Sequence, residues 1–152
     1  MEIRRPRDEQ ELAAALALRE EVFCGEQGVR LDGDQDGRDV EALQLVAVDG
    51  EVLGTCRLLV EPGGTAKFAR LCVRSTARGR GLAAALLAAA EEEARAAGAV
   101  RIGMHAQTGA LQLYERAGYT PYGDRFDEEG IEHLGMEKHL TGTSSASTRS
   151  PA

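Results

Sequence analysis

The sequence has few cysteines, and their arrangement argues against two kinds of site. The three cysteines, Cys24, Cys56 and Cys72, are widely spaced and include no C-x-x-C pair of the kind that holds zinc or carries redox chemistry. Disulfide-rich proteins belong to oxidising compartments, so an odd and scattered set of thiols favours a reducing setting. We therefore expect a cytoplasmic protein.

Long apolar runs are also missing from the chain. The N-terminal segment begins with basic residues, but the uncharged core that a signal peptide needs is interrupted by Asp8, Glu9, Glu11 and Glu20. No apolar run approaches the length that crosses a membrane. We expect a soluble protein that does not associate with membranes.

Basic residues are outnumbered by acidic ones, and the formal net charge is -7. Because binding to nucleic acid requires a basic face, this balance argues against a general nucleic-acid binder. The excess is reversed locally, since residues 67–80 contain no acidic residue and five basic ones: Lys67, Arg70, Arg74, Arg78 and Arg80. Such a segment either solvates a sheet edge or binds an anion.

The length and composition indicate one folded domain. With 152 residues and 43% hydrophobic content, the chain is long enough for one core and too short for two ordinary domains. Beyond Leu140 no apolar residue is large enough to anchor the chain. We predict a domain over residues 1–140 and a disordered tail over 141–152.

The first half of the sequence predicts a helix followed by a meander of strands. Asp8 and Glu11 have the spacing of a capping box, and apolar residues then recur at helical spacing, which predicts a helix over residues 8–23. The β-rich segments 43–48 and 52–60 are joined by Asp-Gly, a strong hairpin signal. A third strand is predicted over residues 66–73.

The second half alternates helices and strands. Segment 82–97 is rich in alanine and leucine and ends at Gly98, which predicts a helix. A strand over 100–106, a short helix from Thr108 to 117 and two further strands, 119–122 and 131–138, complete the pattern. This order indicates a mixed α/β fold with helices on the faces of one sheet.

The glycines at 79 and 81 favour the anion-binding interpretation of the basic segment. Residues 78–83 read Arg-Gly-Arg-Gly-Leu-Ala and lie between a predicted strand and a predicted helix. Glycines allow the backbone to approach a bulky anion, and the amides of a helix N-terminus point at it with the favourable end of the helix dipole. The segment therefore predicts a phosphate cradle.

Three classes of phosphate ligand could use this cradle. A nucleotide P-loop is excluded because no Gly-Lys-Ser/Thr follows. The glycines at 79 and 81 with Ala84 satisfy the loose dinucleotide fingerprint. However, the next predicted strand ends in His105-Ala106-Gln107, where a dinucleotide fold places an acidic residue. The third class is coenzyme A.

Segment 78–83 resembles the Q/R-x-x-G-x-G/A pyrophosphate loop of the GCN5-related N-acetyltransferase (GNAT) family, preceded by its cofactor-pairing strand at 71–73. Segment 107–119 resembles the later family pattern N-x-x-A-x-x-x-Y-x-x-x-G-F, with glutamine in place of asparagine at Gln107. Segments 26–29 (Glu-Gln-Gly-Val) and 129–136 (Glu-Gly-Ile-Glu-His-x-x-Met) resemble its ElaA-like subgroup. Together these similarities cover most of residues 1–140.

The resemblance implies the GNAT fold, with a mainly antiparallel sheet and two splayed strands that end near Val73 and Ala106. It also implies acetyl-CoA or another acyl-CoA as co-substrate, with pantetheine pairing to one strand. The cofactor-binding residues that it implies are Leu71, Cys72, Val73, Arg78, Gly79, Arg80, Gly81, Leu82, Ala83, Gln107 and Tyr114.

The resemblance further implies a mechanism. Backbone amides near Cys72 and Val73 would stabilise the oxyanion, and Tyr114 would protonate the departing thiolate. Glu26 and His133 are the candidates for the catalytic base, while we interpret His105 as structural. Cys72 has no identified partner base, so direct transfer is simpler than a covalent acyl-enzyme.

A cluster of aspartates separates the first helix from the meander. Asp32, Asp34 and Asp36 with Gly37 match the opening of an EF-hand loop, but Leu43 stands where the closing glutamate is required. We therefore expect no metal, and interpret the cluster as a solvated or substrate-facing loop. An acidic entrance would attract a cationic amine.

The sequence thus predicts an N-acyltransferase that transfers an acetyl group from acetyl-CoA directly to a primary amine of a small molecule or peptide. A non-catalytic acyl-CoA sensor of the same fold and a nucleotide-binding interaction domain are the alternatives. The acceptor, the acyl length and the oligomeric state stay open, with a homodimer among the options.

Overall fold

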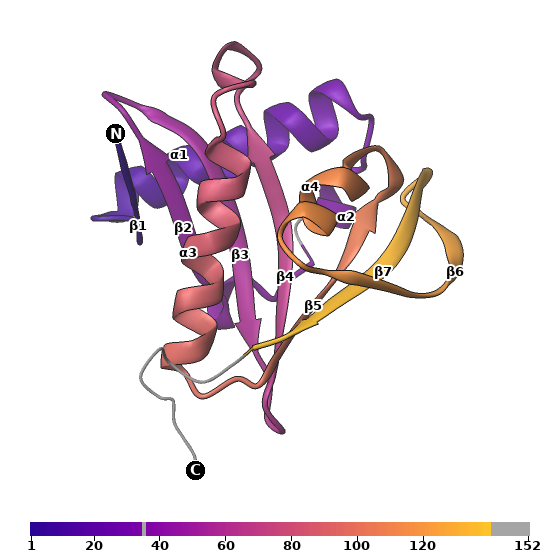
Figure 1. Cartoon of the computed structure of the whole chain (residues 1–152). Helices are drawn as coiled ribbons and strands as arrows, with labels where there is room; N and C mark the ends of the chain where they lie inside the picture. Colours follow the sequence, from indigo (N-terminus) through magenta and orange to yellow (C-terminus); the bar gives the residue numbers. More distant parts are fainter. Residues whose placement is uncertain (35, 141–152) are drawn as a thin grey trace.

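The chain forms one seven-stranded sheet, as a computed structural model shows for residues 1–34 and 36–140 (Figure 1). Residue 35 and the expected disordered tail, 141–152, lie outside the described residues. The strand order is β1-β2-β3-β4-β5-β7-β6, and all neighbours are antiparallel except β4 and β5. The strands are β1 (Glu2–Arg4), β2 (Leu43–Val48), β3 (Val52–Val60), β4 (Thr65–Val73), β5 (Arg101–Gln107), β6 (Thr120–Glu128) and β7 (Ile131–His139).

Helices cover both faces of the sheet. Helix α3 lies on one face and α1 on the opposite face (Figure 1). The helical segments are α1 (Glu9–Arg19), the π-helix η1 (Glu20–Glu26), α2 (Leu31–Asp34), α3 (Leu82–Ala96) and α4 (Leu111–Arg116), with single turns at η2 (Asp39–Glu41), η3 (Ser75–Ala77) and η4 (Thr108–Ala110). The mixed α/β architecture predicted from the element order is therefore confirmed.

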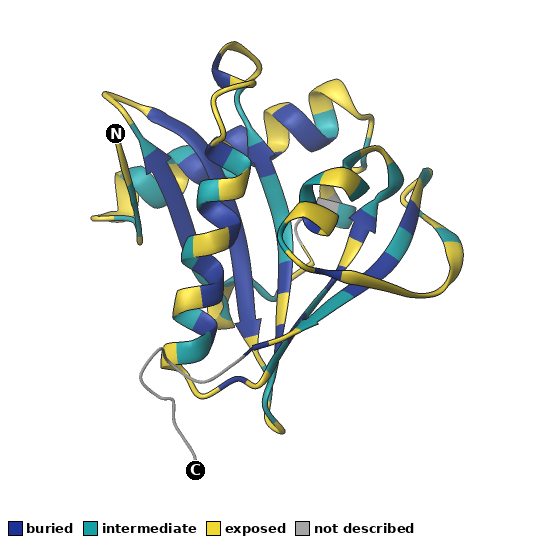
Figure 2. Cartoon of the chain, in the orientation of Figure 1, coloured by how far each residue is buried: buried dark blue, intermediate teal, exposed yellow. Residues whose placement is uncertain are grey.

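The two hydrophobic layers follow from the alternation of side chains along the strands. On β2, Leu45 and Ala47 pack with α3, whereas Val46 packs with α1. Both faces of the central strands are therefore apolar and buried, while the outer strand β6 is largely exposed (Figure 2). This burial explains why apolar residues dominate segments 43–48 and 52–60 on both faces.

Several boundaries differ from the sequence prediction. The first helix begins as predicted, with the Asp8 side chain accepting a hydrogen bond from the Glu11 amide at 2.9 Å, but it becomes a π-helix from Glu20. Strand β6 continues to Glu128, so residues 123–128, which lie between the two predicted strands, form its second half. The pattern analysis did not identify β1 or α2.

The sheet opens between β4 and β5. These strands are paired at only three positions, the last of them Lys67 with Gly103, and no further pairing joins them within the described residues. At Arg70 the backbone has a φ of 60°, and the β3–β4 register shifts nearby. An extra residue of this kind bends a strand, so β4 turns away from β5 (Figure 1). The predicted splayed strands are confirmed.

A polar network joins the two halves of the opened sheet. Glu91 of α3, only 8% exposed, accepts a hydrogen bond from the Tyr119 hydroxyl at 2.8 Å and one from Lys138 Nζ at 3.2 Å. Lys138 lies on β7 and also donates to the Ala117 carbonyl at 2.8 Å. Because α3 packs on β2 to β4, this network connects both sides of the opening.

Buried arginines anchor the loop that follows α2. Arg57 of β3 is 4% exposed, and its two terminal nitrogens donate hydrogen bonds to the Asp36 carboxylate at 2.8 and 2.9 Å. Arg19, which is fully buried, donates to Asp39 at 2.7 Å. The hydrogen bonds from Arg57 hold the pKa of Asp36 well below its ordinary value. The loop is therefore fastened over the sheet by ion pairs.

These ion pairs predict a pH-dependent stability. Asp36→Asn should lower the free energy of unfolding at neutral pH by about 1–2 kcal/mol, because the pair is partly exposed. The folded-state pKa is depressed, so the contribution is complete above the unfolded pKa of about 3.9 and is lost as the pH falls below it. Thermal unfolding followed by circular dichroism should therefore show the two proteins converging below about pH 4. The exposed Asp124→Asn is the control, and an unchanged gap at low pH would contradict the prediction.

Candidate functional site

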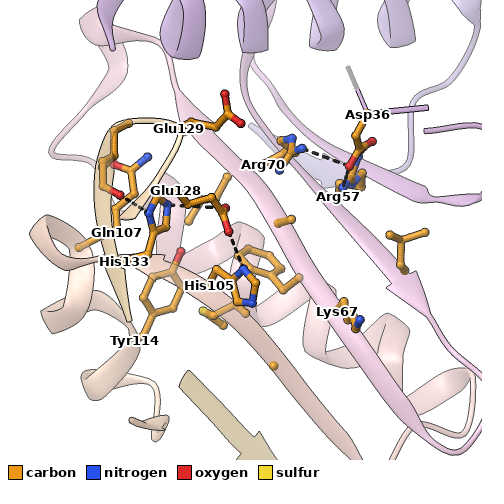
Figure 3. Close-up of a pocket in the computed structure, with 18 of the residues that line it drawn as sticks. Asp36, Arg57, Lys67, Arg70, His105, Gln107, Tyr114, Glu128, Glu129 and His133 are labelled. Carbon is orange, nitrogen blue, oxygen red and sulfur yellow. Dashed lines mark hydrogen bonds and ion pairs between the residues drawn. The ribbon is translucent and has the colours of Figure 1, made fainter. Parts of the chain in front are cut away.

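A cavity of about 570 Å³ lies where β4 and β5 diverge (Figure 3). Alternate residues of β5, namely Arg101, Gly103, His105 and Gln107, line it, while Ile102 and Ala106 belong to the core under α3. Segments from η1, the α2 loop and the β6–β7 hairpin complete the wall. The opening of the sheet is therefore the feature that creates the cavity.

The predicted phosphate cradle adjoins the end of β4. Gly79 and Gly81 have φ values of 82° and 79°, and a Cβ at either position would meet no atom within 4 Å. These glycines are needed for their left-handed backbone, and the space beside them is open. No side chain of the described residues caps the first turn of α3, so its amides are available to an anion.

The loop arginines have different roles. Arg78 donates to the Val73 carbonyl at 2.9 Å and to Glu26 at 2.8 Å, so it ties the loop to β4 and to η1. Arg80 is exposed, and its one hydrogen bond within the described residues is a long one, 3.4 Å, to the Thr76 carbonyl. Glu26, predicted as a candidate base, therefore lies beside the cradle, and it is not among the described residues that line the cavity.

The predicted pantetheine-binding strand is divided between the cavity and the core. Leu71 lines the cavity, whereas Cys72 is 5% exposed and packs with apolar residues on the α1 face. At the start of α3, Leu82 is buried and Ala83 is half-buried. Cys72 is not among the described residues that line the cavity.

Tyr114 reaches the cavity from α4. Its ring is 7% exposed and makes edge contacts with Phe68 and Tyr119, at centroid distances of 6.4 and 6.0 Å. Burial raises the pKa of the Tyr114 phenol above its ordinary value. The hydroxyl therefore stays protonated at neutral pH and is a weaker acid than that of an exposed tyrosine.

Gln107 forms hydrogen bonds with Gln27, a residue far from it in the sequence. Its side-chain nitrogen donates to Gln27 Oε1 at 2.9 Å, and Gln27 donates back to Gln107 at 3.4 Å. Both residues line the cavity, one from the end of β5 and one from the end of η1. This reciprocal amide pair joins the two sides of the cavity.

Two histidines and one carboxylate meet on the wall formed by β5, β6 and β7 (Figure 3). His133 Nδ1 lies 2.7 Å from the Ile131 carbonyl oxygen, and its Nε2 lies 4.0 Å from Glu128 Oε2. The other oxygen of Glu128 lies 2.8 Å from His105 Nδ1. Sequence reasoning missed Glu128 because it placed that residue in a loop. His105 was expected to be structural, yet it lines the cavity.

The aspartate cluster is only partly described. Asp36 lines the cavity, but its charge is offset by Arg57 and by Arg70, which donates at 3.2 Å. The side chains of Asp32 and Asp34 lie outside the described residues. Asp36 is therefore a structural anchor and not an open anionic group. Within the described part of the chain, no helix is long and apolar enough to cross a membrane.

Comparison with known proteins identifies the fold and the family. A family model described as an acetyltransferase (GNAT) domain matches residues 33–140. The uncharacterized N-acetyltransferase YjcF of Bacillus subtilis is 34% identical over 134 residues, which cover 87% of this chain and 95% of that protein.

Solved structures agree. An acyl-CoA N-acyltransferase from Pseudomonas aeruginosa has a TM-score of 0.78 at 29% identity and covers 90% of this chain and 97% of that one. Escherichia coli ElaA has a TM-score of 0.79 at 22% identity and covers 90% of this chain and 97% of that one, so the two proteins share a fold. Together with the opened sheet, these matches establish that the chain belongs to the GNAT family of acetyltransferases.

Proposed function

We propose that this protein transfers an acetyl group from acetyl-CoA directly to a primary amine. The observation that carries the proposal is the cavity between β4 and β5, because Tyr114 and His133 lie in its wall together with Leu71, near the end of the strand that leads into the cradle. Family membership supports an acetyltransferase, and the acyl-CoA named for the Pseudomonas aeruginosa neighbour supports the donor.

The residues at the end of β4 fit coenzyme A. The α3 amides and the backbone of Gly79 and Gly81 would bind its diphosphate, with Arg80 adding charge. Beyond Lys67 the described part of β4 forms no ladder with β5, so this edge has room to hydrogen-bond an amide-containing arm. Bound acetyl-CoA would supply the activated thioester.

The cavity residues would accept and donate the protons that the reaction transfers. An ammonium loses two protons when it becomes an amide, and His133 takes the first before attack. Tyr114 protonates the departing thiolate, and the second proton, released from the acylated nitrogen, restores the Tyr114 phenol through solvent. The amine nitrogen bonds to the carbonyl carbon as the carbon–sulfur bond breaks, and backbone amides near Cys72 and Val73 stabilise the oxyanion. We favour His133 over Glu26 as the base because His133 lines the cavity, whereas Glu26 is ion-paired with Arg78.

The first test is turnover. Purified protein with acetyl-CoA should release free thiol in the presence of at least one member of a primary-amine library. Tyr114→Phe should then lower kcat by about ten- to hundredfold, since general-acid catalysis is lost. Isothermal titration should show the affinity for coenzyme A unchanged. Normal turnover by this variant would remove Tyr114 from the mechanism, and coenzyme A binding without any turnover would favour a sensor.

Tyr119→Phe is the matched control. Its hydroxyl hydrogen-bonds Glu91 and is outside the cavity lining given for the described residues. This variant should lose about 1 kcal/mol of stability and keep its kcat.

The second test concerns the cradle. Gly81→Ala should weaken coenzyme A binding by about tenfold, because a Cβ at this left-handed position strains the loop and occupies the space of the diphosphate. Gly50→Ala changes a glycine of nearly the same φ, 78°, in the β2–β3 turn. It should show a similar loss of thermal stability with normal coenzyme A affinity. Equal affinities of the two variants would exclude the proposed cradle.

A further inference from the structure

Glu128 lies between two histidines that come from different strands. Its Oε1 is 2.8 Å from His105 Nδ1 on β5, and its Oε2 is 4.0 Å from His133 Nε2 on β7. Strand register explains the meeting, because His133 pairs with Gln107 on one side and with Phe126 on the other. The cluster therefore depends on the fold and not on sequence proximity.

The hydrogen bond to Ile131 determines which nitrogen of His133 can accept a proton. A carbonyl oxygen only accepts hydrogen bonds, so Nδ1, at 2.7 Å from it, carries the hydrogen. The neutral ring then has its lone pair on Nε2. This is the nitrogen that faces Glu128.

His105 orients the carboxylate in a similar way. An ionised carboxylate only accepts, so His105 Nδ1 donates to Oε1 and leaves Oε2 for another donor. Phe126 stacks on His133, with a centroid distance of 5.9 Å and an interplanar angle of 22°, and it meets the edge of His105 at 5.0 Å. Both imidazole rings are thus held by packing as well as by hydrogen bonds.

The result is a pair of acceptors 4.0 Å apart, His133 Nε2 and Glu128 Oε2, that cannot hydrogen-bond each other while the histidine is neutral. A nitrogen about 2.8 Å from both would see them roughly 90° apart. The N–H bonds of an ammonium group point about 109° apart, which is close to this requirement. One ammonium can therefore donate to both acceptors at once.

We propose that His133 Nε2 and Glu128 Oε2 together bind the ammonium group of the acceptor, and that His105 holds Glu128 in position. This inference rests on the proposed function and specifies its substrate as a protonated amine with at least two N–H bonds. One N–H proton passes to His133 Nε2, and the resulting imidazolium is stabilised by Glu128. The neutral amine is left with its lone pair available for attack.

Exposure along the cluster gives the proton a route outward. The side chain of His133 is 9% exposed, that of Glu128 39% and that of His105 56%. The base is thus shielded from water, whereas the far end of the cluster reaches solvent. Among the other acidic residues of the cavity wall, Glu129 and Glu137 add negative charge, while Asp36 is already paired with arginines.

The test measures binding of a simple ammonium without turnover. The chain has only three histidines, His105, His133 and His139, so ¹³C-labelled histidine gives three ring signals, assigned with His105→Gln and His139→Gln. At about pH 8, above the ordinary histidine range, methylammonium chloride should shift the His133 and His105 signals saturably. Tetramethylammonium chloride has no N–H and should not shift them.

Two carboxylate variants make the test specific. Glu128→Gln should weaken methylammonium binding by about tenfold or more, because one charge-assisted hydrogen bond is lost. Glu132→Gln removes the same charge from β7, where Glu132 contacts Thr108 and Arg125 outside the described cavity lining, and it should bind normally. The His139 signal reports that each variant is folded.

Each outcome decides the question. Equal shifts with both cations, or unchanged binding by folded Glu128→Gln, would overturn the ammonium site. The comparison of the two cations uses the unaltered protein, so it stands even where a variant fails to fold. Methylammonium binding without acetylation of any amine would support the site and count against the proposed function, whereas acetylation without methylammonium binding would do the reverse.

Discussion

The loss of hydrogen bonding between β4 and β5 is the constraint on which the rest of the structure depends. After the pair Lys67–Gly103 the strands diverge, and the backbone groups that face the gap must find other partners. A sheet normally avoids such a gap because unpaired edges invite unwanted association. Here the gap is bordered by a cavity, so beyond Lys67 the strand β4 has a cavity beside it instead of a neighbouring strand.

An open sheet needs support from elsewhere, and polar contacts supply it. Glu91 connects α3 with Lys138 of β7, and the buried Arg57 holds the α2 loop through Asp36. Removing the carboxylate from such a contact leaves the buried Arg57 or the partly buried Lys138 without its partner, which destabilises the fold. These contacts therefore favour a single arrangement of the two halves of the opened sheet, and the spacing of the cavity walls depends on that arrangement.

Features that depend on neighbouring residues could be predicted from the sequence, whereas contacts between distant segments could not. Gly79 and Gly81 lie between a strand and a helix, so short-range spacing alone indicated the cradle. The second half of β6 was missed because Pro121, Gly123 and Asp124 are poor strand formers, and pairing with β7 outweighs that preference. With that register unknown, the meeting of Glu128 with two histidines could not be deduced. The burial of Arg57 beneath the aspartate cluster could not be deduced either, since nothing in the composition of the cluster indicates it.

The paired amides of Gln27 and Gln107 form a contact between two walls of the cavity that can be exchanged at little cost. Both hydrogen bonds are exposed to solvent, so water can replace either partner when the amides separate. Because the pair joins the segment after η1 to the end of β5, these two segments can move apart without the loss of a buried contact.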